Sequence, residues 1–215
     1  SAVHDMKNSL CLLLQSIETL SRKQDTLDNE DSRELAKLHY EASRLNTNLL
    51  QLLSLYRTEK SQLPINIEEH YIEDIFAEVV AKNQLYIDQQ NIELALEAPT
   101  ELAWYLDPDL VTNLLSDILV NAMRYSHKKI ALKAAIEDEI LTITVEDNGE
   151  GYPQFMLDFD LTEMSGMKLT AGRTGLGLYF AKMIAEAHQS GDSKGNIALS
   201  NGGQLGGGVF TLRLP

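Results

Sequence analysis

Glycines cluster ahead of one predicted helix in a pattern that favours phosphate binding. The run 172–177 contains three glycines and is followed by apolar residues with helical spacing up to residue 187. Glycines at a helix start let backbone N–H groups and the positive end of the helix dipole face an anion. The run lacks the Gly-Lys-Ser/Thr ending of a Walker loop and the spacing of a dinucleotide fingerprint. It therefore indicates another kind of phosphate site.

An acidic turn with glycines follows the most regular strand pattern in the chain. Leu141, Ile143 and Val145 alternate with polar residues, and the turn 147–151 (Asp-Asn-Gly-Glu-Gly) comes next. A carboxylate at a strand end can accept a hydrogen bond from a ligand's amino group, and glycines allow close approach to the backbone. Alone, such a turn usually indicates only a tight connection.

Three polar side chains share one face of the helix predicted at residues 108–125. Asp117, Asn121 and Arg124 are spaced four and three residues apart, as neighbours on a helix surface are. The other face is apolar, so the helix can pack on a core. Without further motifs, a polar helix face is typical of solvated surface.

One histidine near the N-terminus has a setting that the others lack. His4 is followed by Asp5, and Asn8 lies one helical turn further on. His4 also follows Val3, the first residue of an apolar repeat, which predicts an imidazole exposed on the flank of a helix. A lone histidine on a helix is generally unreactive, so this reading depends on the domain attached to it. The other four histidines are interpreted as structural.

The first domain, residues 1–62, is predicted to be an antiparallel helical hairpin. Apolar residues recur with 3,4 spacing over residues 3–20 and 35–56, on either side of the polar stretch 22–32. Further leucines beside these seams give more apolar surface than one hairpin can bury. We therefore expect a homodimer in which two hairpins form a four-helix bundle.

The second domain, residues 63–215, is predicted to be a two-layer α/β sandwich, which makes the whole chain α+β. Heptads give way to alternating strands and glycine turns between residues 61 and 64. In chain order the pattern predicts a strand at 65–68, a helix at 72–89, strands at 92–97 and 102–106, a helix at 108–125, strands at 129–136 and 140–146, an irregular segment at 152–172, a helix at 175–188 and two last strands ending at residue 214.

Composition and charge argue against several classes of partner. The formal net charge of −14 disfavours nucleic acid, which requires clustered lysines and arginines. Cys11 is the single cysteine, so we expect a reducing compartment and a cytoplasmic location. No apolar run approaches the ~20 residues that span a bilayer, and we expect no membrane contact by these residues.

Together these segments resemble the sensor histidine kinases of two-component systems. Residues 4–8 resemble their H box, 117–126 their N box, 147–151 and 172–178 their two glycine boxes, and 206–212 their closing glycine turn and last strand. The match spans nearly the whole chain, and its motifs are jointly specific although each is weak alone. It implies a Bergerat-type ATP-binding fold, with ATP and Mg²⁺ as cofactors and a response-regulator receiver domain as partner.

The resemblance also implies the chemistry of the H box. His4 would accept the γ-phosphoryl group of ATP, and Asp5 would orient or accept the other ring proton. Asn8 would orient water for dephosphorylating the regulator. The regulator would receive the phosphoryl group on an aspartate.

In the second domain the resemblance implies a nucleotide site. Asp117 and Asn121 are assigned to Mg²⁺, and Asp117 also to catalysis. Arg124 would pair with phosphate, and Asp147 would accept the adenine amino group. The residues expected to bind the nucleotide are Asn121, Arg124, Tyr125, Asp147, Gly149, Gly151, Arg173, Thr174, Gly175, Leu176 and Gly177.

Four features depart from the family pattern or match it loosely. Ser9 stands where many relatives have proline, and Asp117 where kinases commonly have asparagine and the related ATPases a water-activating glutamate. The chain begins three residues before His4, so we expect upstream helical turns and a sensory region, with or without a membrane anchor, to be missing. Residues 152–172 are interpreted as a mobile lid over ATP, although Phe155 and Phe159 fit the family's phenylalanine motif only loosely.

Two other functions stay open at this point. A phosphotransfer or docking protein with a degenerate ATP domain is disfavoured by the intact glycines and Asp147. Asp117 keeps open an ATPase whose nucleotide cycle drives conformational change, and the H box disfavours it. Nucleotide binding separates the first alternative from the rest, and acid-labile phosphate on His4 separates the kinase from the ATPase.

Overall fold

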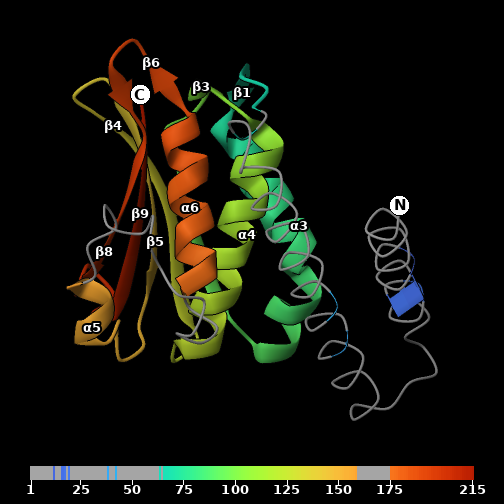
Figure 1. Ribbon diagram of the computed structural model, residues 1–215. Helices are drawn as coiled ribbons and strands as arrows, with labels where there is room; N and C mark the ends of the chain where they lie inside the picture. Colours follow the sequence, from blue (N-terminus) through green and yellow to red (C-terminus); the bar gives the residue numbers. More distant parts are fainter. Residues whose placement is uncertain are drawn as a thin grey trace, which may run out of the picture. The chain divides into compact units, whose positions relative to one another are not determined.

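The computed structural model describes residues 63, 65–158 and 175–215, together with six helical positions at 12, 16, 17, 19, 38 and 42 (Figure 1). The chain divides into two compact units, Ser1–Ser61 and Gln62–Pro215. All elements named below belong to the second unit. Apart from those six positions, the predicted hairpin lies outside the described residues, as does the whole H box, so the bundle stays a prediction.

A five-stranded mixed sheet forms one layer of the second unit. Its order is β2 (Glu93–Glu97), β4 (Lys129–Glu137), β5 (Ile140–Asp147), β9 (Gly208–Leu214) and β8 (Asn196–Asn201). β2 and β4 are parallel, and the other neighbouring pairs are antiparallel. The prediction of a mixed sheet is confirmed.

The two faces of this sheet follow from the alternation of apolar and polar residues. Ala134, Ile143, Leu212 and Ile197 form one row across four strands, and all four are buried. The neighbouring row on the opposite face is polar or small, namely Lys133, Thr144, Thr211 and Ala198. Because successive side chains point to opposite faces, only the first row faces a core. Each fully buried leucine or isoleucine there contributes about 1.5–3 kcal/mol.

Helices form the other layer. α3 (Ile72–Gln90), α4 (Pro108–Tyr125) and α6 (Gly175–Ala187) lie on one side of the sheet (Figure 1). α4 packs against β5 and contacts both other helices, and its Leu115 and Leu119 are fully buried. A mixed sheet covered on one side by helices confirms the part of the predicted fold class that concerns the second domain. None of the helices in the described part of the chain is long and apolar enough to cross a membrane.

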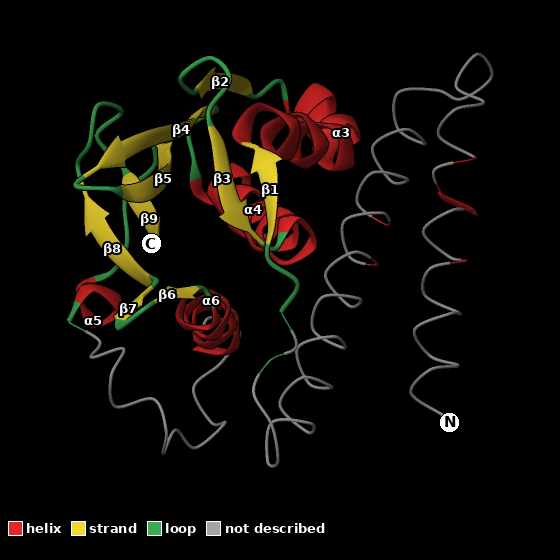
Figure 2. Cartoon of the chain, turned by 90° about the horizontal axis from the view of Figure 1, so that it is seen from above, coloured by secondary structure: helices red, strands yellow, loops and turns green. Residues whose placement is uncertain are grey.

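A separate ribbon pairs β1 (Glu68–Tyr71) with β3 (Ala103–Leu106), apart from the main sheet and beside α3 and α4 (Figure 2). The prediction of a strand at 65–68 is wrong by three residues. Glu68 pairs with Leu106, and the next position along the partner, Asp107, is already the N-cap of α4. Pairing therefore begins at Glu68, where the partner strand ends.

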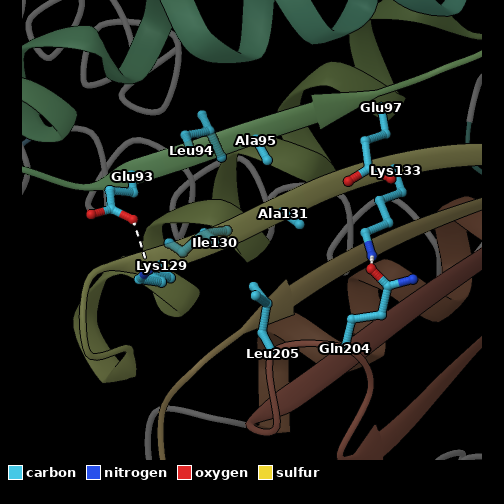
Figure 3. A pocket seen from close by; sticks show the side chains of 10 residues that line it. All are labelled: Glu93, Leu94, Ala95, Glu97, Lys129, Ile130, Ala131, Lys133, Gln204 and Leu205. Carbon is cyan, nitrogen blue, oxygen red and sulfur yellow. Dashed lines mark hydrogen bonds and ion pairs between the residues drawn. The ribbon is translucent and has the colours of Figure 1, made fainter.

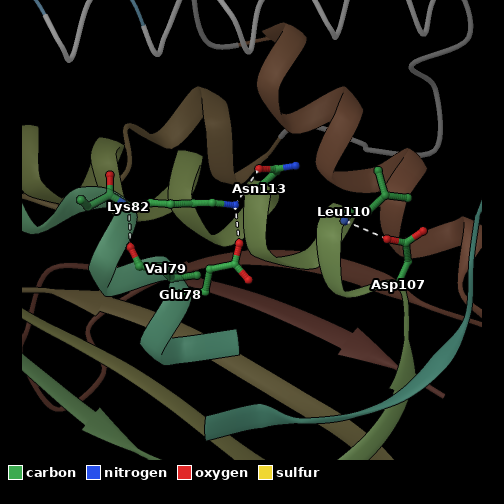
Figure 4. A network of polar contacts seen from close by, with 7 residues as sticks. Glu78, Val79, Lys82, Asp107, Leu110 and Asn113 are labelled. Atoms are coloured by element: carbon green, nitrogen blue, oxygen red, sulfur yellow. Dashed lines mark hydrogen bonds and ion pairs between the residues drawn. The ribbon is translucent and has the colours of Figure 1, made fainter. Parts of the chain in front are cut away.

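Asp107 fixes the start of α4. Its Oδ1 accepts the backbone N–H of Leu110 at 2.9 Å and its Oδ2 accepts that of Asn66 at 2.8 Å. A side-chain cap followed by proline at the first helical position is a strong start signal. Further along, Lys82 of α3 bonds Asn113 of α4 at 3.4 Å (Figure 4).

Three short elements were not predicted. The helix α5 (Gln154–Leu157) and the strands β6 (Gln189–Ser190) and β7 (Ser193–Lys194) are too short to carry a periodic pattern. The first residues of the predicted lid include the short helix α5, and the lid's mobility stays a prediction. Residues 159–172 of that segment lie outside the described part.

Candidate functional site

The C-termini of α4 and β5 and the N-terminus of α6 lie at the same end of the second unit (Figure 1). A short link joins the C-terminus of α4 to β4, where Ile130 pairs with Asp147 at the end of β5. His188, which directly follows α6, accepts the backbone N–H of Asp107 at 3.0 Å on its Nε2. Because that bond ties the C-terminus of α6 to the N-terminus of α4, the two helices are antiparallel. The N-terminus of α6 thus lies at the same end as Asp147.

Asp147 is a buried carboxylate with one oxygen held in place by the backbone. The residue is 7% exposed. Its Oδ1 accepts the N–H of Gly149 at 2.7 Å and of Gly208 at 3.3 Å, while its backbone oxygen accepts the N–H of Gly207 at 3.0 Å. Among the described residues, no donor is placed on Oδ2. This oxygen can therefore accept a hydrogen bond from a ligand.

The glycines around Asp147 are required by space. A Cβ on Gly149 would collide with the backbone oxygen of Tyr125, and one on Gly208 would lie 2.9 Å from Asp147 Oδ2. Gly149 therefore packs the acidic turn directly against the last residue of α4. Gly208 leaves the approach to Oδ2 open.

Asn148 holds the same turn from the other side. Its Oδ1 accepts the backbone N–H of Lys129 at 3.0 Å, and its Nδ2 donates to the backbone oxygen of His127 at 3.3 Å. Both bonds reach the link between α4 and β4. The side chain of Asn148 thus ties the acidic turn to the residues that follow the predicted N box, and we assign it no ligand.

The polar face of α4 points to solvent near this turn. Asn121 and Arg124 are exposed, Asp117 is half-buried, and Tyr125 is 66% exposed. Asp117 and Asn121 lie four residues apart on the helix, so their oxygens share one surface. The polar face of α4, which carries the predicted N-box residues, therefore ends near Asp147, at the same end of the unit.

Tyr152 is a neighbour of Asp147 that sequence reasoning passed over. A Cβ on Gly208 would lie 3.1 Å from Tyr152 Cε2 and 2.9 Å from Asp147 Oδ2, so the ring and the carboxylate border the same space. Burial, and secondly the charge of Asp147, raise the pKa of the Tyr152 phenol. The phenol therefore stays protonated and can donate a hydrogen bond. The sequence signal that could have identified Tyr152 is its position directly after Gly151, the second glycine of the acidic turn.

The remaining predicted residues are only partly described. Gly175, Leu176 and Gly177 form the first turn of α6, so the second glycine box does open a helix. Arg173 and Thr174 lie outside the described residues, as do His4, Asp5 and Asn8.

A hollow on another part of the sheet is distinct from this site. It lies between β2, β4 and the loop at Gln204 and Leu205, with a volume of about 270 Å³ (Figure 3). Lys129 pairs with Glu93 at 3.1 Å across its edge, and Lys133 bonds Gln204 at 2.8 Å. None of the predicted site residues lines it. The cations and carboxylates there neutralise one another.

The second unit matches a known family. The sequence profile described as "Histidine kinase-, DNA gyrase B-, and HSP90-like ATPase" matches residues 106–215, which include every described residue of the candidate site. The chain belongs to this family. Its predicted class, a sensor histidine kinase with an ATP-binding catalytic domain of this family, is confirmed by the relatives that follow.

Curated relatives extend the match toward the N-terminus. The chain is 27% identical to "Sensor histidine kinase CpxA" of Escherichia coli K12 over 193 residues, covering 86% of this chain and 40% of that protein. It is 26% identical to "Sensor-like histidine kinase SenX3" of Mycobacterium tuberculosis, covering 99% and 52%. "Sensor protein SrrB" of Staphylococcus aureus is 26% identical, covering 99% and 36%. The chain thus spans about half or less of these relatives.

Solved structures share the fold. The histidine kinase AdeS of Acinetobacter baumannii has a TM-score of 0.62 at 22% identity, covering 98% of this chain and 96% of that one. Full-length ShkA in complex with AMPPNP has a TM-score of 0.63 at 18% identity, covering 100% and 44%. The catalytic domain of histidine kinase ThkA has a TM-score of 0.57 at 20% identity, covering 70% and 96%.

Proposed function

We propose that this chain transfers the γ-phosphoryl group of ATP to His4 and then to an aspartate of a response-regulator receiver domain. The observation that carries the proposal is the carboxylate of Asp147. It is buried, fixed through Oδ1, and presents Oδ2 at the end of the unit where α4 and α6 converge. This arrangement suits a purine with an exocyclic amino group better than an anion, because an ionised carboxylate only accepts hydrogen bonds.

The ATP site on this view uses two kinds of residue. Asp147 accepts the adenine amino group, with Gly149 and Gly151 allowing the base to approach the backbone. The phosphates extend toward the α6 N-terminus, where Arg173 to Gly177 supply backbone N–H groups and the positive end of the dipole. Arg124 and Tyr125, exposed at the end of α4, border the same region.

The side chains of Asp117 and Asn121 on α4 carry the kind of oxygen that Mg²⁺ prefers. Asp117 offers a carboxylate and Asn121 an amide oxygen one turn away, and Mg²⁺ is usually held by one or two such groups together with substrate phosphates. When bound, the ion supplies neutralisation of phosphate charge. Asp117 and Asn121 would hold it, and Arg124 would add a positive charge for the phosphoryl group being transferred.

The first domain supplies the acceptor. The imidazole of His4 attacks the γ-phosphorus in line, the bond to the β-phosphate oxygen breaks, and ADP leaves. Asp5 holds the other ring nitrogen's proton. The phosphoryl group then passes to the receiver aspartate, and Asn8 orients water for its later removal. We assign the hairpin to residues 1–62 and the catalytic domain to residues 63–215. The protein forms a homodimer through the hairpin. It lies in the cytoplasm, either free or as the cytoplasmic part of a membrane-anchored sensor.

The test must separate this activity from the two alternatives. Calorimetric titration of the chain with ATP and Mg²⁺ is expected to show binding, whereas a degenerate domain would give none. Prolonged incubation with ATP is expected to leave acid-labile, base-stable phosphate on the protein. Steady release of inorganic phosphate with no protein-bound phosphate would favour the ATPase instead.

A further inference from the structure

Asn201, at the end of β8, binds both polar backbone groups of a residue far away in sequence. The N–H of Tyr152 donates to Asn201 Oδ1 at 2.6 Å, and Asn201 Nδ2 donates to the carbonyl oxygen of Tyr152 at 2.8 Å. The two residues are 49 positions apart. A side-chain amide that accepts from the N–H of one residue and donates to the C=O of the same residue replaces the partner that a neighbouring strand would provide.

Gly151 packs directly against the side-chain amide of Asn201. Its φ is +82°, a backbone conformation that favours glycine. A Cβ on Gly151 would lie 2.6 Å from Asn201 Oδ1 and 2.9 Å from Nδ2. The amide therefore occupies the space that a side chain at residue 151 would need.

The loop after Asn201 is attached to the other side of the same site. Gly207 N–H donates to the backbone oxygen of Asp147 at 3.0 Å, and Gly208 N–H to Asp147 Oδ1 at 3.3 Å. The N–H of Gln204 donates to Glu146 Oε2 at 3.0 Å. Asn201 and the loop that follows it thus bond the acidic turn both before and after its two glycines.

We propose that Asn201 is a positioning residue for adenine recognition. It touches no ligand itself, but it fixes the backbone of Tyr152 and, through Gly151, the turn that carries Asp147. The inference rests on the proposed ATP site and adds a residue to it from a different strand. A loop-stabilising role alone would leave the nucleotide affinity of the folded protein unchanged.

The test compares Asn201→Ala with Asn196→Ala in the full chain. Both side chains are exposed and lie at opposite ends of β8, so Asn196→Ala controls for weakening of the strand. Calorimetry well below the unfolding transition is expected to show about tenfold weaker binding of ATP and of adenosine to Asn201→Ala, a loss in the range of one or two hydrogen bonds. Inorganic triphosphate, which lacks the base, should bind both variants and the parent equally.

A second variant tests the packing directly. Gly151→Ala should weaken ATP binding by its clash with the Asn201 amide. In the Asn201→Ala background that clash is gone, so the same substitution should weaken binding less, which is a coupling between contacting residues. Equal effects in both backgrounds would contradict the proposed contact.

The outcomes separate the two levels of the argument. Unchanged affinity of Asn201→Ala for ATP and adenosine, with or without a lower melting temperature, overturns the positioning role and leaves the proposed function standing. Equal losses for triphosphate and adenosine also overturn it, because the effect would then not concern the base. A parent chain that binds no ATP overturns the proposed function, and this inference with it.

Discussion

At the residue scale, two buried aspartates differ in how their oxygens are used. Asp107 accepts one backbone N–H on each oxygen, so one oxygen caps α4 at Leu110 and the other holds Asn66. Asp147 accepts both of its side-chain bonds on Oδ1, from Gly149 and Gly208. A buried acceptor costs free energy unless it has a partner. The arrangement at Asp147 therefore favours a ligand donor at Oδ2.

Asp147→Asn is expected to weaken ATP binding strongly. The amide oxygen can still accept from Gly149 and Gly208, which leaves a donor NH₂ facing the adenine amino group. Losing a hydrogen bond to a charged group costs about 1.5–3 kcal/mol, or roughly 10- to 150-fold in affinity. Calorimetry checks this, with Glu150→Gln in the same turn as the charge-matched control because Glu150 is exposed. Equal affinity of the two variants would refute the adenine site.

The two roles proposed for the H box should separate by mutation. His4→Gln is expected to remove autophosphorylation while ATP binding stays intact, because the nucleotide contacts lie in the other domain. Asn8→Ala should keep autophosphorylation within a few-fold but slow dephosphorylation of the regulator, since orienting a water is a positioning effect. Assays of both reactions on both variants check this. If dephosphorylation is unchanged in Asn8→Ala, Asn8 is only a solvated helix residue.

Some site residues could be predicted from sequence and others could not. Asp147 and Gly149 form a local motif whose meaning comes from its distance to Asn121 along the chain. Asn201 carries no such signal, because an Asn-Gly pair by itself indicates a turn. Its contact with Tyr152 depends on how β8 pairs within the sheet, which no local pattern specifies.

At the element scale, helices were easier to predict than strand ends. The bounds of α4 follow from its capping aspartate, its proline and its apolar face, and all three signals are local. The start of β1 depends on where β3 ends, so the pattern at residues 65–68 was misleading. The hairpin of β6 and β7 has two residues in each strand, fewer than any alternation needs.

The contact between α4 and α6 is expected to make stability depend on pH. His188 is buried, accepts from Asp107 N–H on Nε2, and lies 2.7 Å from the Ile184 oxygen through Nδ1, which must then carry the proton. Burial lowers the pKa of His188, against opposing contributions from the Ile184 carbonyl and then Asp107. A neutral imidazole is thus part of the folded state.

The sign of the effect follows from proton binding. Below the ordinary pKa of about 6.5 the unfolded chain takes up a proton at His188 that the folded chain does not, so stability falls as pH falls, by at most about 1.4 kcal/mol per pH unit. Urea unfolding at pH 7.5 and 5.5 should show a loss about 1 kcal/mol larger for the parent than for His188→Gln. Identical losses would show that His188 titrates normally.

At the scale of the whole molecule, the hairpin predicts self-association. The apolar residues flanking the seams of residues 3–20 and 35–56 exceed what two helices can bury against each other. Light scattering of the chain is therefore expected to report a dimer whose fraction rises with concentration. A monomer at high micromolar concentration would contradict the four-helix bundle.

The central claim joins the two domains: nucleotide held by Asp147 phosphorylates His4. The most direct measurement incubates the parent chain, His4→Gln and Asp147→Asn with γ-labelled ATP and Mg²⁺ and follows protein-bound label. We expect acid-labile label on the parent, none on His4→Gln although it still binds ATP, and strongly reduced label on Asp147→Asn at limiting ATP. Label on His4→Gln equal to that on the parent would place the acceptor elsewhere and contradict the account.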